Sequence, residues 1–214
     1  MNVTIIGAGN MARGIGSRLL AAGHNVKLVA HNPEKGGELA GALKATAKKG
    51  ASIQAVPYGQ AITDELVVLA VPYPADVNIV KEYADKLAGK TVIDVATPLN
   101  ATYDGLATAA DTSAGEEVGK VAPNGAKVVK SFVTNFAQTL VDGNVAGQPL
   151  DVFVAGDDAH AKEIVSQLIK STGLRPLDVG GLSRARQLEG LHLINISLQS
   201  KLEKPWMNGI KFVG

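Results

Sequence analysis

A glycine-rich segment near the start of the chain has the residue types and spacing of a phosphate-binding loop. The sequence GAGNMA fits the pattern G-x-G-x-x-[GA] and stands between the apolar run NVTII and a segment with helical periodicity. Gly7 permits a tight turn, Gly9 leaves room for a pyrophosphate, and Ala12 lets the helix lie close to the strand. The free N–H groups and the dipole of the helix favour bound phosphate. We therefore expect a dinucleotide to bind at Gly7, Ala8, Gly9, Asn10, Met11 and Ala12. The alternative is a glycine turn without a ligand.

The residues that follow the second predicted strand bear on which dinucleotide binds. An NAD site carries an Asp or Glu there, which binds the ribose hydroxyls and repels a 2′-phosphate. In this chain the strand ends in VAHN, and the first carboxylate is Glu34, which we expect in the first turn of the next helix. His31, Asn32 and Lys35 are able to hydrogen-bond to a 2′-phosphate and neutralise it. The pattern predicts NADP(H) as cofactor. The alternative is a solvated loop in a site that accepts both cofactors.

Two further strand ends are expected to face the same crevice, because parallel strands present ligands at their carboxyl ends. One is the segment AVPYP and the other is DVATP. Their prolines restrict the loops and leave backbone amides and polar side chains to face the nicotinamide. The residues expected there are Ala70, Val71, Pro72, Tyr73, Ala96 and Thr97. For Tyr73 the alternative is an aromatic side chain that packs on its own loop.

No pair of side chains is spaced for acid–base or nucleophilic catalysis. Hydride transfer between stacked rings needs short distance, alignment and dry surroundings more than an acid or a base, so the absence of a clear dyad agrees with it. Thr134 and Asn135 follow a predicted strand and are candidates for contact with a second substrate. The alternative is that they belong to an ordinary polar loop.

The histidines and arginines are more readily explained by structural roles than by catalysis or metal binding. The four histidines are dispersed without metal-ligand spacing, so we expect no metal site. His192 falls among apolar residues of the last long helix and is expected to be a core or interface histidine. Arg186 and Glu189 are three residues apart, which favours a pair on the surface of that helix.

The elements that must position these residues follow an alternating pattern. Short β-branched runs, apolar on both faces, indicate buried strands at 2–6, 26–30, 52–56, 66–71, 91–95, 127–132, 151–155 and 174–179. Helices are expected at 10–22, 34–48, 75–87, 113–119, 158–170 and 182–201. This alternation predicts an α/β fold, a Rossmann-type doubly wound parallel sheet with a small C-terminal helical lobe. We expect the NAD(P)-binding domain to span 1–180 and the lobe, packed on it, to span 181–214.

Composition narrows the class of protein. Of 214 residues, 46% are hydrophobic and 19% charged, the net charge is +1, and no block of one sign predicts a nucleic-acid partner or a membrane surface. The absence of cysteine excludes disulfides, thiolate nucleophiles and iron–sulfur clusters. The start MNVTII resembles neither a signal peptide nor a membrane span, and we expect a cytoplasmic protein.

Several segments together resemble one known family. These are GAGNMARGIGSRLLAAGHNV, VVLAVPY, KVVKSFVTN and GLRPLDVGGLSRARQLEGLHLINI, and they cover nearly the whole chain. They are similar to the NADP oxidoreductase, coenzyme F420-dependent family, which is akin to the reductase domain of the STEAP metalloreductases. The resemblance implies a Rossmann domain, a small C-terminal lobe, a dimer, and hydride transfer between NADP(H) and the deazaflavin F420. In this chain Ala30 and His31 stand where archaeal F420 reductases carry Ser-Arg, and Val133 stands where they place a His near the deazaflavin.

The leading interpretation is therefore an NADPH-dependent oxidoreductase with a flavin- or deazaflavin-like acceptor of F420 type. One alternative is a reductase of a small imine or carbonyl substrate. Such enzymes append a long helical domain, whereas only about 35 residues follow Gly180 here. A second alternative is an NADP-binding redox sensor without turnover. The last helix is apolar over more than one stripe, which predicts a homodimer.

Overall fold

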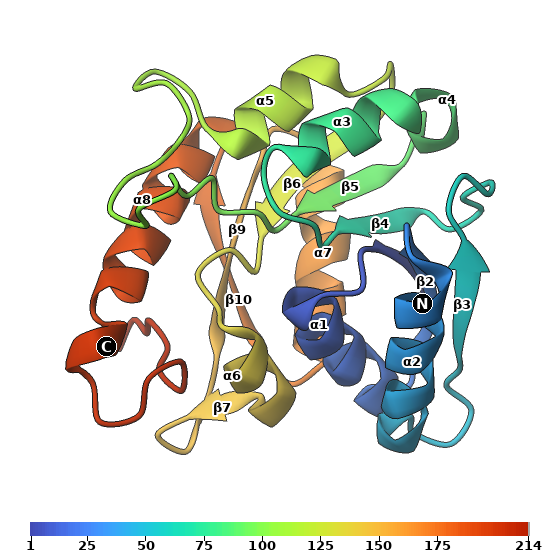
Figure 1. Ribbon diagram of the computed structural model, residues 1–214, viewed down its shortest axis with the longest axis horizontal. Coiled ribbons are helices and arrows are strands. Elements are labelled where there is room, and N and C mark those ends of the chain that lie inside the picture. The colour runs from blue at the N-terminus through green and yellow to red at the C-terminus, as the bar shows by residue number, and fades with distance from the viewer. Residues whose placement is uncertain (214) are drawn as a thin grey trace.

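The computed structural model describes residues 1–213 as one large, mostly parallel β-sheet covered by helices (Figure 1). The strand order is β10-β9-β6-β5-β4-β1-β2-β3. The strands are β1 (Asn2–Ile6), β2 (Asn25–Ala30), β3 (Ile53–Pro57), β4 (Leu66–Leu69), β5 (Thr91–Asp94), β6 (Lys127–Ser131), β9 (Asp151–Gly156) and β10 (Arg175–Gly180). A separate small hairpin joins β7 (Asn144–Val145) to β8 (Gln148–Pro149). This order confirms the Rossmann-type doubly wound fold.

One pairing departs from the expected all-parallel sheet. β9 runs antiparallel to β6, with Lys130 opposite Ala155, while β10 runs parallel to β9. The short helix α6 and the β7–β8 hairpin lie between β6 and β9 in the chain, and this connection lacks the long helical crossover that a parallel pair requires. The last two strands therefore enter the sheet in the opposite direction.

Helices cover both faces because the central strands are apolar on both faces. The helices are α1 (Asn10–Ala21), α2 (Pro33–Leu43), α3 (Ala75–Glu82), α4 (Ala84–Leu87), α5 (Ala114–Val121), α6 (Ala137–Asp142), α7 (Ala159–Ser171) and α8 (Ala185–Ser197). Short 3₁₀ turns are η1 (Lys44–Thr46), η2 (Leu182–Arg184) and η3 (Gln199–Lys201). One core cluster joins the sheet to α1, α2 and α7, and a second joins it to α3, α4 and α5. Figure 1 shows α3, α4 and α5 together along one side of the sheet.

The helix boundaries differ from expectation where a buried side chain interrupts a periodic pattern. The helix expected at 75–87 breaks at Tyr83, which is 1% exposed and whose hydroxyl accepts a hydrogen bond from the Gly59 N–H. The helix expected at 182–201 divides into η2, α8 and η3. α6 was not expected, because its six residues are too few to show a period.

The topology places the carboxyl ends of β1 and β4 where the strand order reverses. From β1 the chain builds β2 and β3 on one side, then crosses back to build β4, β5 and β6 on the other. In such sheets the crevice at this reversal is the ligand site. Within residues 1–213, no helix is long and apolar enough to cross a membrane.

Candidate functional site

The first glycine of the loop is held against the neighbouring strand end. Gly7 has a φ of +125° and donates its N–H to the Val29 carbonyl at 2.8 Å. A Cβ atom at this position would lie 2.2 Å from the Ala70 carbonyl oxygen. Only glycine fits so close an approach in that backbone conformation. Gly7 therefore lets the β1 and β4 ends meet.

The second glycine opens a cradle at the start of α1. Gly9 precedes the helix without a side-chain cap, and the first turn carries no acidic residue. A Cβ atom at Gly9 would meet nothing within 4 Å, so the space in front of these N–H groups is open. Free N–H groups at the positive end of a twelve-residue helix are complementary to a pyrophosphate. Ala12, in the first turn of α1, is fully buried, as close packing of this helix on the sheet requires.

One end of the crevice has the position expected for adenosine, beside the glycine loop and the end of β2. A cavity of about 310 Å³ lies beside the glycine loop and β2. Its lining includes Gly7, Ala8, Gly9, His31, Asn32 and Lys35. The His31 ring lies 5.0 Å from Tyr58, and the Asn32 side chain caps α2 by accepting the Lys35 N–H. Glu34 lies in the first turn of α2, as expected. His31 and Lys35 thus remain the candidates for contact with a 2′-phosphate.

The opposite end of the crevice holds a cavity of about 260 Å³. Its lining includes Gly9, Asn10, Met11, Ala70, Val71, Pro72, Ala96 and Thr97. The loops after β1, β4 and β5 therefore meet here as the strand-end argument predicted. The same cavity is lined by Val133 and Asn135, which follow β6, and by His192 of α8. A nicotinamide is expected at this end, since it must lie on the far side of the pyrophosphate from adenosine.

A third cavity of about 440 Å³ adjoins the second. The two cavities share Asn10, Met11, Asn135 and His192. The larger one is otherwise mainly apolar, with Phe136, Val141, Ile196 and Trp206 in its lining. The rings of Phe136 and Trp206 meet edge to face at 5.2 Å. A flat apolar ligand in this cavity would therefore lie next to the nicotinamide end.

His192, which the sequence pattern predicted as a core or interface histidine, lines both cavities of this cleft. It is 8% exposed, and its ring lies 5.1 Å from Phe136. Burial lowers the pKa of His192 to about 4, so the imidazole is neutral at physiological pH. Its place among apolar helix residues indicated burial, and the structure adds that the buried face meets a cavity.

Thr134 and Asn135, the candidates for contact with a second substrate, are buried and do not lie in an exposed polar loop. Thr134 is 1% exposed and Asn135 is 2% exposed. The Asn135 amide donates to the Asp151 carbonyl at 3.0 Å, while its Oδ1 atom has no partner among the described residues. Of the two, Asn135 lines both cavities.

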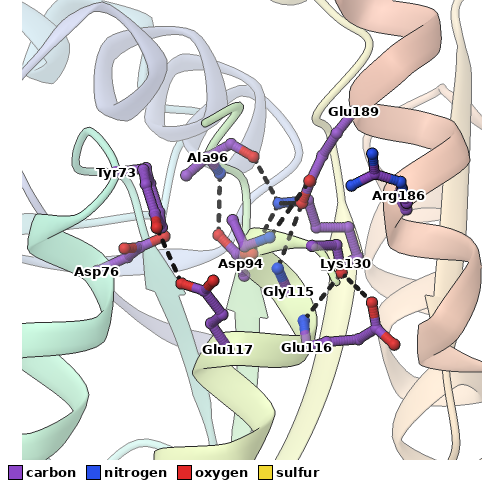
Figure 2. Close-up of polar contacts among 12 residues, drawn as sticks. Tyr73, Asp76, Asp94, Ala96, Gly115, Glu116, Glu117, Lys130, Arg186 and Glu189 are labelled. Atoms are coloured by element: carbon purple, nitrogen blue, oxygen red, sulfur yellow. Dashed lines mark hydrogen bonds and ion pairs between the residues drawn. The ribbon is translucent and has the colours of Figure 1, made fainter. Parts of the chain in front are cut away.

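Tyr73 turns its hydroxyl to α5. It donates a hydrogen bond to the Glu117 carboxylate at 2.9 Å (Figure 2). Burial and the adjacent Glu117 raise the pKa of Tyr73 to about 12, so it is a neutral donor. It is not among the residues that line the cavity next to Ala96, and its expected contact with the cofactor stays a prediction.

A buried cluster of charges lies directly behind the Ala96 loop. Lys130 Nζ lies 2.7 Å from Asp94 Oδ2 and 2.8 Å from Glu189 Oε1, and all three side chains are fully buried (Figure 2). Burial alone would lower the pKa of Lys130, but the two carboxylates outweigh it and hold the pKa above its ordinary value. Lys130 and Asp94 each interrupt an apolar strand, which is the sequence signal that could have found the cluster.

The cluster corrects the expected Arg186–Glu189 surface pair. Glu189 points to Lys130 and away from Arg186 (Figure 2). Arg186 donates to the carbonyls of Ala109 and Thr112. The spacing was compatible with a helix-surface pair. However, a buried ammonium without a counter-charge costs much more free energy than an exposed guanidinium without one, so the carboxylate pairs with Lys130.

Replacing the buried Asp76 by asparagine should stabilise the protein at neutral and alkaline pH. Burial and the charge of Asp94 raise the pKa of Asp76 from 3.8 to about 7. Between those values the unfolded chain releases a proton that the folded chain keeps, so stability falls as pH rises and is level above 7. Asp76→Asn should remove that fall and gain roughly 2 to 4 kcal/mol above pH 7, at about 1.4 kcal/mol per pKa unit. Urea unfolding from pH 4 to 9 measures it. The exposed Asp111→Asn is the control, and an equal gain at pH 4 would contradict the assignment.

Comparison with known proteins identifies the family. The family model for "NADP oxidoreductase coenzyme F420-dependent" matches residues 2–98. The F420-dependent NADP reductase of Methanothermobacter marburgensis is 26% identical over 214 residues, covering 94% of this chain and 95% of that one. A crystal structure from Arthrobacter sp. FB24, provisionally assigned as an F420-dependent NADP reductase, superposes with a TM-score of 0.79 at 31% identity and 95% coverage of both chains.

A longer relative matches over part of its length. Metalloreductase STEAP3 of Rattus norvegicus is 29% identical over 191 residues, which are 89% of this chain and 36% of that protein. The match therefore concerns one part of the metalloreductase. Full-length similarity, the matched glycine loop and the shared fold agree with one another. The chain belongs to the NADP oxidoreductase, coenzyme F420-dependent family of NADP-dependent oxidoreductases.

Proposed function

We propose that this protein transfers a hydride between NADP(H) and a flat acceptor of flavin or deazaflavin type, such as F420. The observation that carries the proposal is the pair of adjoining cavities at the nicotinamide end, which share four lining residues. One accepts a nicotinamide, and the larger, apolar one accepts a second ring system beside it. The names of the relatives support the same acceptor chemistry.

The proposed binding residues divide between the two ligands. We assign to NADP(H) the residues Gly7, Ala8, Gly9, Asn10, Met11, Ala12, His31, Asn32, Lys35, Ala70, Val71, Pro72, Tyr73, Ala96 and Thr97, all of which except Ala12 and Tyr73 line the cavity at the adenosine end or the one beside it at the nicotinamide end. We assign to the acceptor Asn135, which lines both cavities at the nicotinamide end together with neutral His192, and the adjacent buried Thr134. The nicotinamide supplies the hydride. The chain supplies alignment and a dry surface, which such a transfer needs more than an acid or a base.

Turnover tests the proposal. NADPH oxidation is followed at 340 nm with F420, FMN, FAD and a ferric chelate as separate acceptors. Oxidation with F420 or a flavin supports the proposal. Binding of NADPH without turnover on any acceptor would favour a redox sensor and overturn it. Turnover with the ferric chelate alone would also overturn it, since that acceptor has no ring to stack.

Cofactor choice yields a separate prediction at His31. The Arg variant, His31→Arg, adds a permanent charge with a planar fork of donors at the rim of the adenosine cavity. NADPH binding should tighten about tenfold and NADH binding should change little, because only NADPH carries the 2′-phosphate. Titration calorimetry with both cofactors measures this. His160→Arg on the surface of α7 controls for the added charge, and equal tightening for NADH would contradict the proposal.

The C-terminal part, 181–214 in the proposed division from the domain 1–180, offers an apolar surface for a second copy. Ile194 of α8 is 59% exposed, and Leu198 and Leu202 beyond it are 42% and 38% exposed. We expect a homodimer through this surface, because a row of large exposed apolar side chains is unfavourable in water. Light scattering should give twice the chain mass, and Ile194→Lys should give a monomer. A monomeric parent protein at micromolar concentration would contradict it.

A further inference from the structure

The backbone N–H and C=O of Ala96 are both held by the buried cluster. Its N–H donates to Asp94 Oδ1 at 2.9 Å, and its carbonyl accepts from Lys130 Nζ at 2.5 Å (Figure 2). The same residue lines the cavity at the nicotinamide end. These two bonds hold the peptide groups on either side of Ala96, so the position of this loop depends on Asp94 and Lys130.

Lys130 is in turn fixed from the far side by Glu189. Besides the 2.8 Å contact with Lys130, the Glu189 carboxylate accepts the N–H groups of Ala114 and Gly115 at the start of α5, at 3.2 and 3.3 Å. Glu189 lies on α8, one helical turn before His192, which lines the same cavity as Ala96. A chain of short polar contacts therefore runs from α8 through Lys130 to the Ala96 loop.

We propose that Glu189 is a positioning residue which, through Lys130, fixes the Ala96 loop against α8 and so sets the nicotinamide end of the cleft. This inference rests on the proposed function, because it assumes that this cavity holds the nicotinamide. Packing alone does not require the cluster, since apolar residues of similar volume often stabilise a core equally well. What an ion pair adds is direction, because its hydrogen bonds define the place of each atom.

The test separates the two ends of the cofactor. Glu189→Gln keeps the side-chain volume and removes the charge that orients Lys130. Its affinity is measured for NADPH, for NADP⁺ and for 2′-phosphoadenosine diphosphoribose, which lacks the nicotinamide. We expect NADPH and NADP⁺ each to bind roughly tenfold more weakly, because misplaced binding groups are costly. The fragment should bind within about twofold of the parent protein, because the Ala96 loop does not line the adenosine cavity.

A control comes from a buried carboxylate elsewhere. Asp64 is 6% exposed, accepts from Thr4 at 2.7 Å and pairs with the partly exposed Lys27 at 3.1 Å. It precedes the amino end of β4, whereas the glycine loop follows the carboxyl end of the parallel strand β1. Asp64→Asn should leave all three affinities unchanged.

Each result decides between outcomes. Equal weakening of all three ligands, or of none, would overturn the positioning role. A loss confined to NADP⁺ would also overturn it, because a field effect on the cationic ring would then explain the result. Failure of the parent protein to bind NADPH would instead refute the proposed cofactor site. If Glu189→Gln does not fold, the same three affinities are measured for Glu189→Asp, and the ¹⁵N chemical shift of Lys130 Nζ is measured in the parent protein. That chemical shift should change when NADPH binds and stay constant when the fragment binds. A change with the fragment and none with NADPH would overturn the positioning role.

Discussion

Replacing Gly9 by alanine is expected to weaken NADPH binding about a hundredfold while the fold stays intact. Gly9 has a φ of −89°, which any residue adopts, and an added Cβ atom meets no protein atom within 4 Å. The methyl group would stand where the pyrophosphate must approach the N–H groups of α1. The free energy of unfolding should change by less than about 1 kcal/mol. Titration calorimetry and urea unfolding measure the two quantities.

The other glycine of the loop supplies the comparison. Gly7→Ala places a Cβ atom 2.2 Å from the Ala70 carbonyl in a conformation with φ of +125°. Both the fold and the binding should suffer there, because the β1 and β4 ends must separate. If Gly9→Ala bound NADPH as well as the parent protein does, the loop would be a turn without a ligand.

Lys130→Met should destabilise the protein by roughly 3 to 5 kcal/mol. The variant leaves the carboxylates of Asp94 and Glu189 buried without a cation, and burial already raises the pKa of Glu189. A carboxyl with a raised folded-state pKa costs stability as pH increases through the window between its unfolded and folded values. The deficit should therefore shrink when urea unfolding is repeated at pH 5.5 instead of 8.

An exposed lysine on the same strand provides the control. Lys127 pairs with Asp158 at 3.4 Å, and its side chain is 48% exposed. Lys127→Met should cost less than about 1 kcal/mol and show little dependence on pH, since solvent screens an exposed pair. Equal losses for the two variants would mean that the buried cluster contributes no more than a surface contact.

Much of the fold was predictable from local pattern. The apolar runs at 2–6 and 66–69 are strands because both faces are buried, and the glycine loop sits between β1 and α1 as expected. The antiparallel entry of β9 was not predictable, because strand direction depends on a connection whose short elements carry no periodicity. The break at Tyr83 was likewise hidden, since it follows from a hydrogen bond to Gly59 on a distant loop.

Local sequence patterns alone predicted the glycine loop, the strand ends that meet at the crevice and the lack of an acidic residue directly after β2. These are local features, because residues close together in the chain set the turn conformation, the hydrophobic periodicity and the local charge. The folded chain alone shows that His192 borders the cavity, that Tyr73 donates to Glu117, and that Glu189 reaches Lys130 rather than Arg186. Tyr73 and Glu117 are 44 positions apart in the chain, and Lys130 and Glu189 are 59 apart (189 − 130), so no short spacing encodes these contacts. A buried charge takes the partner that the folded chain brings within reach, and that partner is set by the sheet order and the packing of α5 and α8.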